Sequence, residues 1–182
     1  MTVTHTLDII KILMGFTLYY APAFIANAAP TLVRGRHRVD FGKKFIDGND
    51  ILGGGKTFEG LLCGLILGGT IGLFISFMLN HIPNLPVTLP VFNTIIPLAS
   101  ALGALLGDIG GAFIKRRLGM PRGFPAPILD QLDFILGATL LIKVVGFNPE
   151  VEIVVFSMIL ALILHPMTNK VAYLLKLKDV PW

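Results

Sequence analysis

The sequence has little charge and almost no cysteine. Asp, Glu, Lys and Arg make up 14% of its 182 residues, whereas ordinary soluble domains carry roughly 25%. The single cysteine, Cys63, excludes an internal disulfide framework and a metal site built from several cysteines. The low charge does not suit a disordered chain, a coiled coil or a nucleic-acid-binding arm. No nucleic acid is therefore expected as a partner.

Apolar residues are abundant instead, at 54% of the chain, and the mean hydropathy is +0.77. Five apolar segments are long enough to cross a bilayer, for which a helix needs about 20 residues. We place these spans at residues 9–33, 58–79, 89–114, 126–145 and 151–175. The sequence therefore predicts an all-α integral membrane protein with five transmembrane helices, forming one domain over residues 1–182.

The basic residues alternate between the connections and so predict the topology. Of 15 Lys and Arg, six fall between Arg34 and Lys56 and four between Lys115 and Arg122, and three more lie near the C-terminus. The short connections between these basic segments have no Lys or Arg. Cytoplasmic loops carry the positive excess. We therefore expect loops 34–57 and 115–125 and the C-terminus in the cytoplasm, and the N-terminus outside, in a multi-pass protein of the cell membrane.

Four acidic residues lie in or just inside the predicted spans, toward their cytoplasmic ends: Glu59, Asp108, Asp130 and Asp133. An ionised carboxylate at the centre of a spanning helix costs about 2.5–3.5 kcal/mol, so these groups need a metal, a cation or a water-filled cavity. Asp108 and Lys115 are two helical turns apart and share a helix face. The acids therefore indicate a polar site at the cytoplasmic ends of the spans.

Asp130 and Asp133 are three residues apart and also share a face. Pro127 is expected to open their helix, which places both carboxylates in the first two turns, near the positive end of the helix dipole. Each acid pairing with a nearby Lys or Arg is one interpretation. The other is a Mg²⁺ site for a polyphosphate, because Mg²⁺ takes one or two carboxylates plus substrate phosphates.

The basic residues near these acids are candidates for binding phosphate, because Lys and Arg donors neutralise polyphosphates. The predicted phosphate-binding residues are Lys43, Lys44, Lys56, Lys115 and Arg116. Arg38 and Asp47 are further candidate loop contacts. Four basic residues are assigned to topology alone: Arg36, Lys170, Lys176 and Lys178.

The loop sequence Gly53-Gly54-Gly55-Lys56-Thr57 invites comparison with a P-loop, but Asp50 occupies the place of the first motif glycine and no buried strand precedes it. Free backbone N–H groups at the start of a helix can still bind phosphate. Thr57 and Glu59 are therefore counted among the candidate ligand-binding residues. Thr57 is also expected to cap the second span, with Glu59 just inside it as a weaker Mg²⁺ candidate.

Small and unusual residues within the spans have structural interpretations. Gly64, Gly68 and Gly72 recur at four-residue spacing, which favours close helix packing, either within the chain or at a dimer face. A homodimer therefore stays open. In the fifth span, Pro166 predicts a kink, and His165 is interpreted as structural.

The segment from Gly107-Asp108 through Lys115-Arg116 to Asp130-Gln131-Leu132-Asp133 resembles the signature of the phosphatidate cytidylyltransferases, also called CDP-diacylglycerol synthases. The chain departs from that signature in three places: Ala112 stands for a serine, Gln131 for an arginine, and Pro125-Ala126-Pro127 for His-Gly-Gly. The short five-span chain and its Gly-Gly-Gly-Lys-Thr-Phe-Glu-Gly loop resemble the archaeal branch of the family, the CDP-archaeol synthases.

The resemblance implies a Mg²⁺-dependent cytidylyltransferase that faces the cytoplasm. Its substrates would be CTP and an isoprenoid ether lipid phosphate from the bilayer, 2,3-di-O-geranylgeranyl-sn-glycerol 1-phosphate, and its products CDP-archaeol and pyrophosphate. The implied metal ligands are Asp108, Asp130 and Asp133, with Lys115 beside them in the catalytic set.

Two other classes stay open. A CDP-alcohol phosphotransferase also uses intramembrane aspartates, although its Asp-Gly-x-x-Ala-Arg string is absent from this chain. A small ion or solute transporter would explain buried acids, although transporters usually bind near the bilayer midplane and these acids lie near one side.

Overall fold

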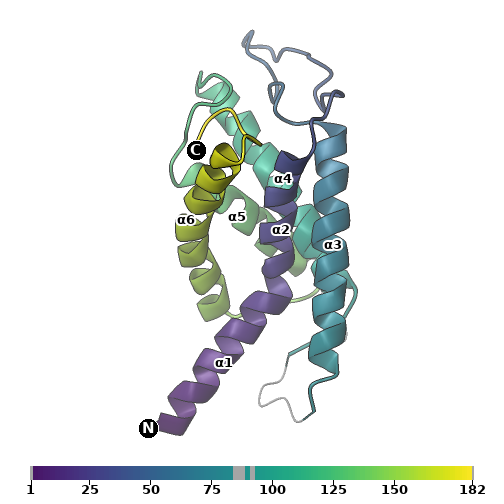
Figure 1. Ribbon diagram of the computed structural model, residues 1–182, viewed down its shortest axis with the longest axis vertical. Helices are drawn as coiled ribbons and strands as arrows, with labels where there is room; N and C mark the ends of the chain where they lie inside the picture. The colour runs from purple at the N-terminus through teal and green to yellow at the C-terminus, as the bar shows by residue number, and fades with distance from the viewer. Residues whose placement is uncertain (1, 84–88, 91–92, 182) are drawn as a thin grey trace.

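The computed structural model describes residues 2–83, 89–90 and 93–181. The helices in this part of the chain are α1 (Thr2–Tyr19), α2 (Ala21–Ala28), the 3₁₀ helix η1 (Ala29–Leu32), α3 (Phe58–Asn80), α4 (Ile95–Arg117), α5 (Leu129–Val144) and α6 (Val151–Leu174). No strand occurs in the described residues, which contain two isolated bridges, Arg38–Thr57 and Lys44–Asp50. The predicted all-α class is confirmed (Figure 1).

Three helices are each long and apolar enough to cross a membrane: α3, α4 and α6. The N-terminal helices pass the same test only as a pair, bent by 42° between α1 and α2. Helix α5 has 16 residues, fewer than the ~20 that a straight crossing needs. Length and composition therefore support three spans, or four if the bent pair is one span.

The predicted span over residues 9–33 is not one continuous helix, because the chain breaks at Tyr20 (φ −122°). Pro22 stands in the first turn of α2. A proline has no N–H to donate to the carbonyl four residues earlier, so it fits the first turn of a helix best. The chain therefore ends one helix at Tyr19 and begins another at Ala21.

Two other predicted boundaries also moved. Helix α5 begins at Leu129, so Pro127 precedes the helix instead of opening it. Asp130 and Asp133 nevertheless lie in the first two turns, as predicted. Helix α4 begins at Ile95; the earlier part of the predicted third span includes residues 91–92, which lie outside the described residues. Helix α6 runs on past Pro166, where the predicted kink stays a prediction.

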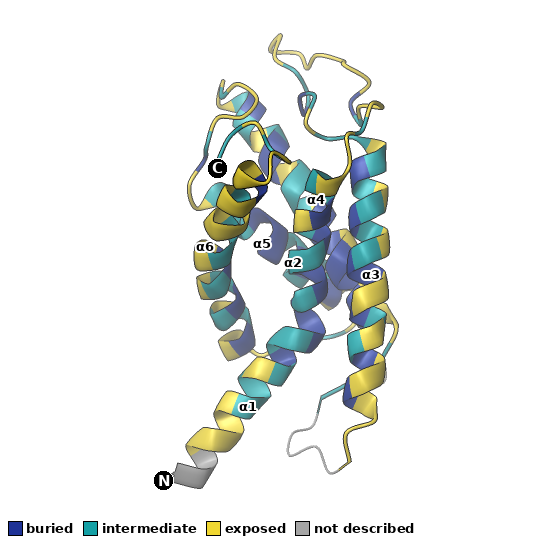
Figure 2. Cartoon of the chain, in the orientation of Figure 1, coloured by how far each residue is buried: buried dark blue, intermediate teal, exposed yellow. Residues whose placement is uncertain are grey.

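Both long basic loops lie at one end of the helical bundle, together with the C-terminal tail, and the N-terminus lies at the other end (Figure 1). The first loop joins η1 to α3, and the second joins α4 to α5. Buried residues line the inward faces of the helices, and exposed apolar residues cover the outward faces of α3 and α6 (Figure 2). This pattern suits helices whose outer surface meets lipid.

Glycines let the helices approach closely at two places. On α3, a Cβ at Gly64 would lie 2.6 Å from the carbonyl oxygen of Ala26, so the predicted small-residue packing occurs within the chain, against α2. On α4, a Cβ at Gly107 would lie 2.2 Å from the carbonyl oxygen of Asp133. Small residues allow such backbone contact between helices. The α4–α5 contact therefore brings the acidic turns of both helices together.

Candidate active site at the loop-bearing end

Two lysine–aspartate ion pairs lie at the end of the bundle that carries both loops. Lys56, just before α3, pairs with Asp108 of α4. Lys115 Nζ, at the end of α4, lies 2.5 Å from Asp130 Oδ1 at the start of α5. All four side chains are between 18% and 25% exposed. Residues from three separate segments thus form one partly buried charged site.

Asp133 is the most buried acid of this site, with 8% of its surface exposed. Its Oδ1 accepts a hydrogen bond from the N–H of Phe134 at 2.6 Å. Its other oxygen faces Gly111, where a Cβ would lie only 2.0 Å away. The charges that act on Asp133 include those of Asp108, Lys56 and Asp130. We call these five residues the lysine–aspartate cluster: Lys56, Asp108, Lys115, Asp130 and Asp133.

The described residues of the cluster do not form a complete metal-binding site by themselves. Among the described residues, no three His, Cys, Asp or Glu side chains gather closely enough to hold a metal ion by themselves. Asp108 and Asp130 are each occupied by a lysine. Mg²⁺ typically takes one or two carboxylates and completes its shell with water and substrate phosphates. The donor set fits a Mg²⁺ ion that arrives with phosphate ligands.

Asp40 organises the first loop. This residue was not among the predicted site residues. Asp40 is 6% exposed, and its carboxylate accepts hydrogen bonds from the N–H groups of Gly42, Leu52 and Gly53 at 2.9–3.1 Å. Burial by itself would raise the pKa of Asp40, but these donors and the charge of Arg38 hold it below its usual value. The only sequence signal is an Asp two residues before a glycine, which is typical of a turn.

Arg116, a predicted phosphate ligand, contacts the first loop. Its side chain is buried. Its Nε donates to the carbonyl oxygen of Leu52 at 3.2 Å, and its Nη1 donates to the carbonyl oxygen of Met120. The guanidinium therefore joins the first loop to the chain that follows α4. Two of its N–H donors are engaged by backbone oxygens, which suits a positioning role.

Arg117, the residue after Arg116, also contacts the first loop. Its guanidinium lies 4.5 Å from the ring centroid of Phe45 and 4.8 Å from that of Phe113. Its Nε lies 3.1 Å from Asp47 Oδ2, and its Nη2 donates to the carbonyl oxygen of Asp50 at 2.5 Å. Cation–π contacts and an ion pair thus fasten the loop to the end of α4. Asp47, a predicted ligand contact, takes part in this anchor.

Thr57 and Glu59 lie where the loop enters α3. The Thr57 hydroxyl accepts from the N–H of Gly60 at 3.2 Å, which confirms the predicted helix cap. Glu59 accepts from the backbone N–H groups of Arg36 and His37, and its Oε1 lies 2.6 Å from His37 Nδ1. Glu59 is therefore engaged with the loop backbone and not with the other carboxylates. We call Asp40, Glu59, Arg116 and Arg117 the loop scaffold.

The remaining predicted phosphate contacts lie on the first loop. Lys43 and Lys44 are exposed, and no contact recorded for the described residues joins their side chains to the lysine–aspartate cluster. The guanidinium of Arg38 lies over the glycine-rich segment, where a Cβ at Gly54 would meet it at 2.4 Å. The absence of a side chain at Gly54 thus leaves room for Arg38.

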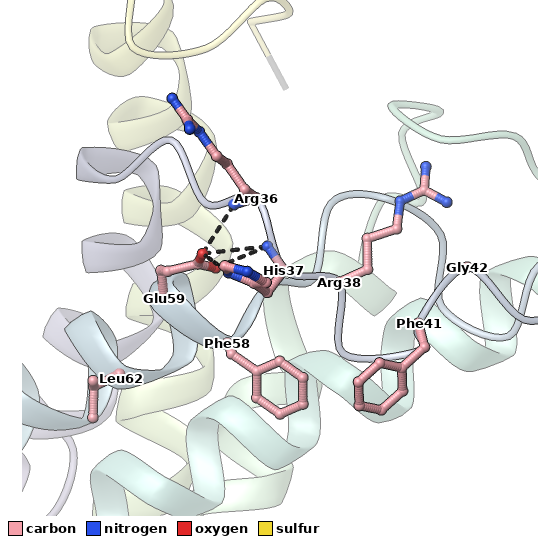
Figure 3. Close-up of a pocket in the computed structure, with 8 residues that line it drawn as sticks. All are labelled: Arg36, His37, Arg38, Phe41, Gly42, Phe58, Glu59 and Leu62. Carbon is pink, nitrogen blue, oxygen red and sulfur yellow. Dashed lines mark hydrogen bonds and ion pairs between the residues drawn. The ribbon is translucent and has the colours of Figure 1, made fainter.

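Two adjoining cavities border the start of α3. The larger has a volume of about 600 Å³ and is lined by Arg36, His37, Arg38, Phe41, Gly42, Phe58, Glu59 and Leu62 (Figure 3). The smaller, of about 240 Å³, lies between α3 and α4 and is lined by Phe58, Leu61, Leu62, Leu65, Leu102, Leu105, Leu106 and Ile109. Two residues, Phe58 and Leu62, line both. An apolar groove between the helices therefore meets a basic mouth at the loop.

Known proteins are similar to this chain over most of its length. The family model for CarS-like CDP-archaeol synthases matches residues 9–182. The CDP-archaeol synthase of Sulfolobus acidocaldarius is 47% identical over 95% of this chain and 99% of its own length. Those of Sulfurisphaera tokodaii and Saccharolobus solfataricus are 43% and 45% identical, each over 91% of this chain and 93% of their own length.

A solved structure is also similar, with a TM-score of 0.75 and 41% sequence identity over 87% of this chain and 94% of that one. It is described as an intramembrane enzyme for archaeal membrane lipid biosynthesis. The resemblance inferred from Asp108, Lys115 and the Asp130–Asp133 segment is thereby confirmed at the level of the family. The chain belongs to the CarS-like family of CDP-archaeol synthases.

Proposed function

We propose that this chain makes CDP-archaeol and pyrophosphate from CTP and 2,3-di-O-geranylgeranyl-sn-glycerol 1-phosphate. Family membership supports the enzyme class and the two substrates. The observation that carries the site assignment is the pair of lysine–aspartate contacts, Lys56–Asp108 and Lys115–Asp130. These contacts place cations for phosphates and carboxylates for a metal ion within one cluster.

The ion pairs explain how the cluster accepts a metal-bound triphosphate. A lysine ammonium is a compact charge on a flexible stem, so it can exchange a carboxylate for a phosphate. When Lys56 and Lys115 turn to the triphosphate, Asp108 and Asp130 are released, and with Asp133 they would hold Mg²⁺. The bound ion supplies charge neutralisation at the phosphates. The partial burial of these side chains strengthens their interactions with the substrate.

The transfer needs little acid–base chemistry. A phosphate oxygen of the lipid forms a bond to the α-phosphorus of CTP, and the bond from that phosphorus to the bridging oxygen breaks as pyrophosphate leaves. The attacking phosphate is already largely ionised near neutral pH, because its second pKa is about 6. Lys56 and Lys115 neutralise charge at the α-phosphate and on the leaving group. Positioning and electrostatics therefore provide the catalysis.

The groove between α3 and α4 supports an entry route for the lipid. Its apolar lining suits isoprenoid chains, and Arg36 and Arg38 are among the residues that line the adjoining cavity at the loop. Ile109, at the end of the groove nearest the loops, directly follows Asp108 in the chain. A Leu102→Trp substitution, which fills the groove, is expected to raise the KM for the lipid phosphate and leave the KM for CTP unchanged. Equal effects on both constants would contradict this route.

We also propose a five-span topology, with the N-terminus outside and the cluster facing the cytoplasm. The shared position of both basic loops and the C-terminus supports it. Helix α5 is about 24 Å long at 1.5 Å per residue, so its flanking residues must complete the crossing. In a Cys63→Ser background, Ile46→Cys should react only from the cytoplasm and His81→Cys only from outside. The reverse pattern would overturn the site assignment.

The decisive experiment is release of pyrophosphate from CTP by the purified protein in detergent, with and without Mg²⁺ and the lipid phosphate. We expect release only when all three are present, and a strong preference for CTP over ATP and GTP. A CDP-alcohol phosphotransferase would instead consume a CDP-lipid and release CMP. A transporter would release neither product, and either result would contradict the proposal.

A further inference from the structure

The C-terminal tail turns back on α6 instead of leaving the bundle. Lys176, just past the helix end, has a φ of +57°, in the left-handed region that favours glycine and often ends helices. The N–H of Leu177 donates to the carbonyl oxygen of Ala172 at 2.9 Å, and the N–H of Lys178 donates to the same oxygen at 3.3 Å. These bonds direct the residue after the turn toward the helix.

The side chain of Lys178 is held by polar residues of α6. Its Nζ donates to Asn169 Oδ1 at 3.0 Å, and Asn169 Nδ2 lies 3.5 Å from Nδ1 of His165, one turn earlier. The His165 ring stacks on Phe134, with 6.2 Å between ring centroids. Phe134 directly follows Asp133. A continuous set of contacts therefore leads from the tail lysine to the acidic turn of α5.

The charges that act on Lys178 are those of the candidate active site. Its electrostatic neighbours are Asp130, Lys56, Lys115 and Asp108. Burial lowers the pKa of Lys178 below its usual value, which expresses the cost of removing an ammonium from water. A lysine that only marks the cytoplasmic side of a membrane needs no burial. Partial burial beside other lysines suits a group that binds an anion.

We propose that Lys178 is a further phosphate-binding residue of this enzyme, holding a phosphate group of a bound substrate from the tail side of the cluster. The proposal rests on the proposed function, because it requires a phosphate-bearing substrate at the cluster. Two sources have this chemistry: the triphosphate of CTP and the phosphomonoester of the lipid. A negative group there would bind three ammonium groups, those of Lys56, Lys115 and Lys178, contributed by three separate segments.

The test is Lys178→Gln in the full-length protein, with Lys170→Gln as the matched control. Lys170 is an exposed lysine of α6, so its loss changes the net charge equally. We expect Lys178→Gln to raise the KM for one substrate by at least about tenfold, since a hydrogen bond to a charged group is worth about 1.5–3 kcal/mol. The melting temperature and the Lys170→Gln kinetics should match the parent protein.

The two kinetic arms identify the source of the phosphate. A raised KM for CTP, with weaker binding of CTP or inorganic pyrophosphate in calorimetry, assigns Lys178 to the triphosphate. A raised KM for the lipid phosphate alone assigns it to the lipid. Unchanged kinetics and binding, or a lower melting temperature with normal kinetics, would overturn the proposal. A parent protein that releases no pyrophosphate from CTP would instead overturn the proposed function, and calorimetry with pyrophosphate would still test Lys178.

Discussion

The acids of the lysine–aspartate cluster and those of the loop scaffold lie at the same end of the molecule but have different partners. Asp108 and Asp130 each pair with a lysine ammonium group, and Asp130 also accepts from the backbone N–H of Ala126, whereas Asp40 and Glu59 are held mainly by backbone N–H groups. A lysine can move to another anion, but a backbone N–H moves only if the loop moves. The first arrangement is suited to exchanging ligands and the second to keeping a loop in place.

The largest effect is expected when a carboxylate that pairs with a lysine is removed. Asp130→Asn is expected to lower turnover by at least ~10²-fold, about 2.7 kcal/mol of transition-state stabilisation, with little change in the melting temperature. Asp133→Asn should behave alike. Glu152→Gln, an exposed acid in the first turn of α6, is the control. A variant at position 130 that folds poorly but keeps its specific activity would show that the ion pair is structural.

A second test displaces the side chain of Asp133 without changing that residue. In Gly111→Ala, the new Cβ would lie 2.0 Å from Asp133 Oδ2, whereas a Cβ at Gly110 would have no neighbour within 4 Å. We expect Gly111→Ala to lower turnover between about tenfold and 10²-fold, because misplacing a catalytic group by 1 Å can cost about 10²-fold. Gly110→Ala should retain full turnover in the same assay. Similar losses of turnover in both variants would show that displacement of Asp133 is not the cause.

The third test loosens the scaffold. Asp40→Asn removes the charge and presents an amide to three backbone donors, which should cost about 1–3 kcal/mol of local stability. Amide hydrogen exchange in residues 40–53 should accelerate, and the KM for CTP should rise by less than turnover falls in Asp130→Asn. Asp50→Asn, in the same loop, is the control. A loss of turnover as large as that of Asp130→Asn would remove the distinction between scaffold and cluster.

The pH dependence of the loop follows from the same acid. The folded-state pKa of Asp40 lies below the ordinary value of 3.8. Its contribution to loop stability is therefore complete above pH 3.8 and is lost as the pH falls through the lower, folded-state pKa. Limited proteolysis of the first loop should give the same cutting rate from pH 5 to pH 8, when normalised to a reference peptide. A loop that loosens near pH 6 would contradict this assignment.

The smallest expected effect belongs to the junction between the two regions. Thr57→Ala removes the cap of α3 beside Lys56 and should cost about 1 kcal/mol of stability. Thr57→Ser keeps the hydroxyl and should restore most of it. Thermal unfolding in detergent measures both variants, and turnover should change less than in any cluster variant. A large loss of turnover with unchanged stability would assign Thr57 to substrate binding.

Much of the site could be predicted from local sequence because its residues are spaced by helical turns. Asp108 and Lys115 share a face of α4, and Asp130 and Asp133 share the first two turns of α5. The roles of Arg116 and Glu59 could not be predicted in this way. A charged residue near a site has the same sequence signature whether it faces a ligand or a backbone carbonyl of a distant loop.

The apolar runs, the alternation of basic loops and the spacing of the acids by themselves determined the helical membrane class and the main candidate residues. The tertiary structure decided which charges meet: Lys56 pairs with Asp108 and Lys115 with Asp130, and the charge of Lys178 interacts with those of both pairs. The physical reason is the distance along the chain between the residues that meet. Helical periodicity orders neighbours within a few turns, whereas these contacts depend on glycine-mediated packing of α4 on α5 and on the turn that reverses the tail at Lys176.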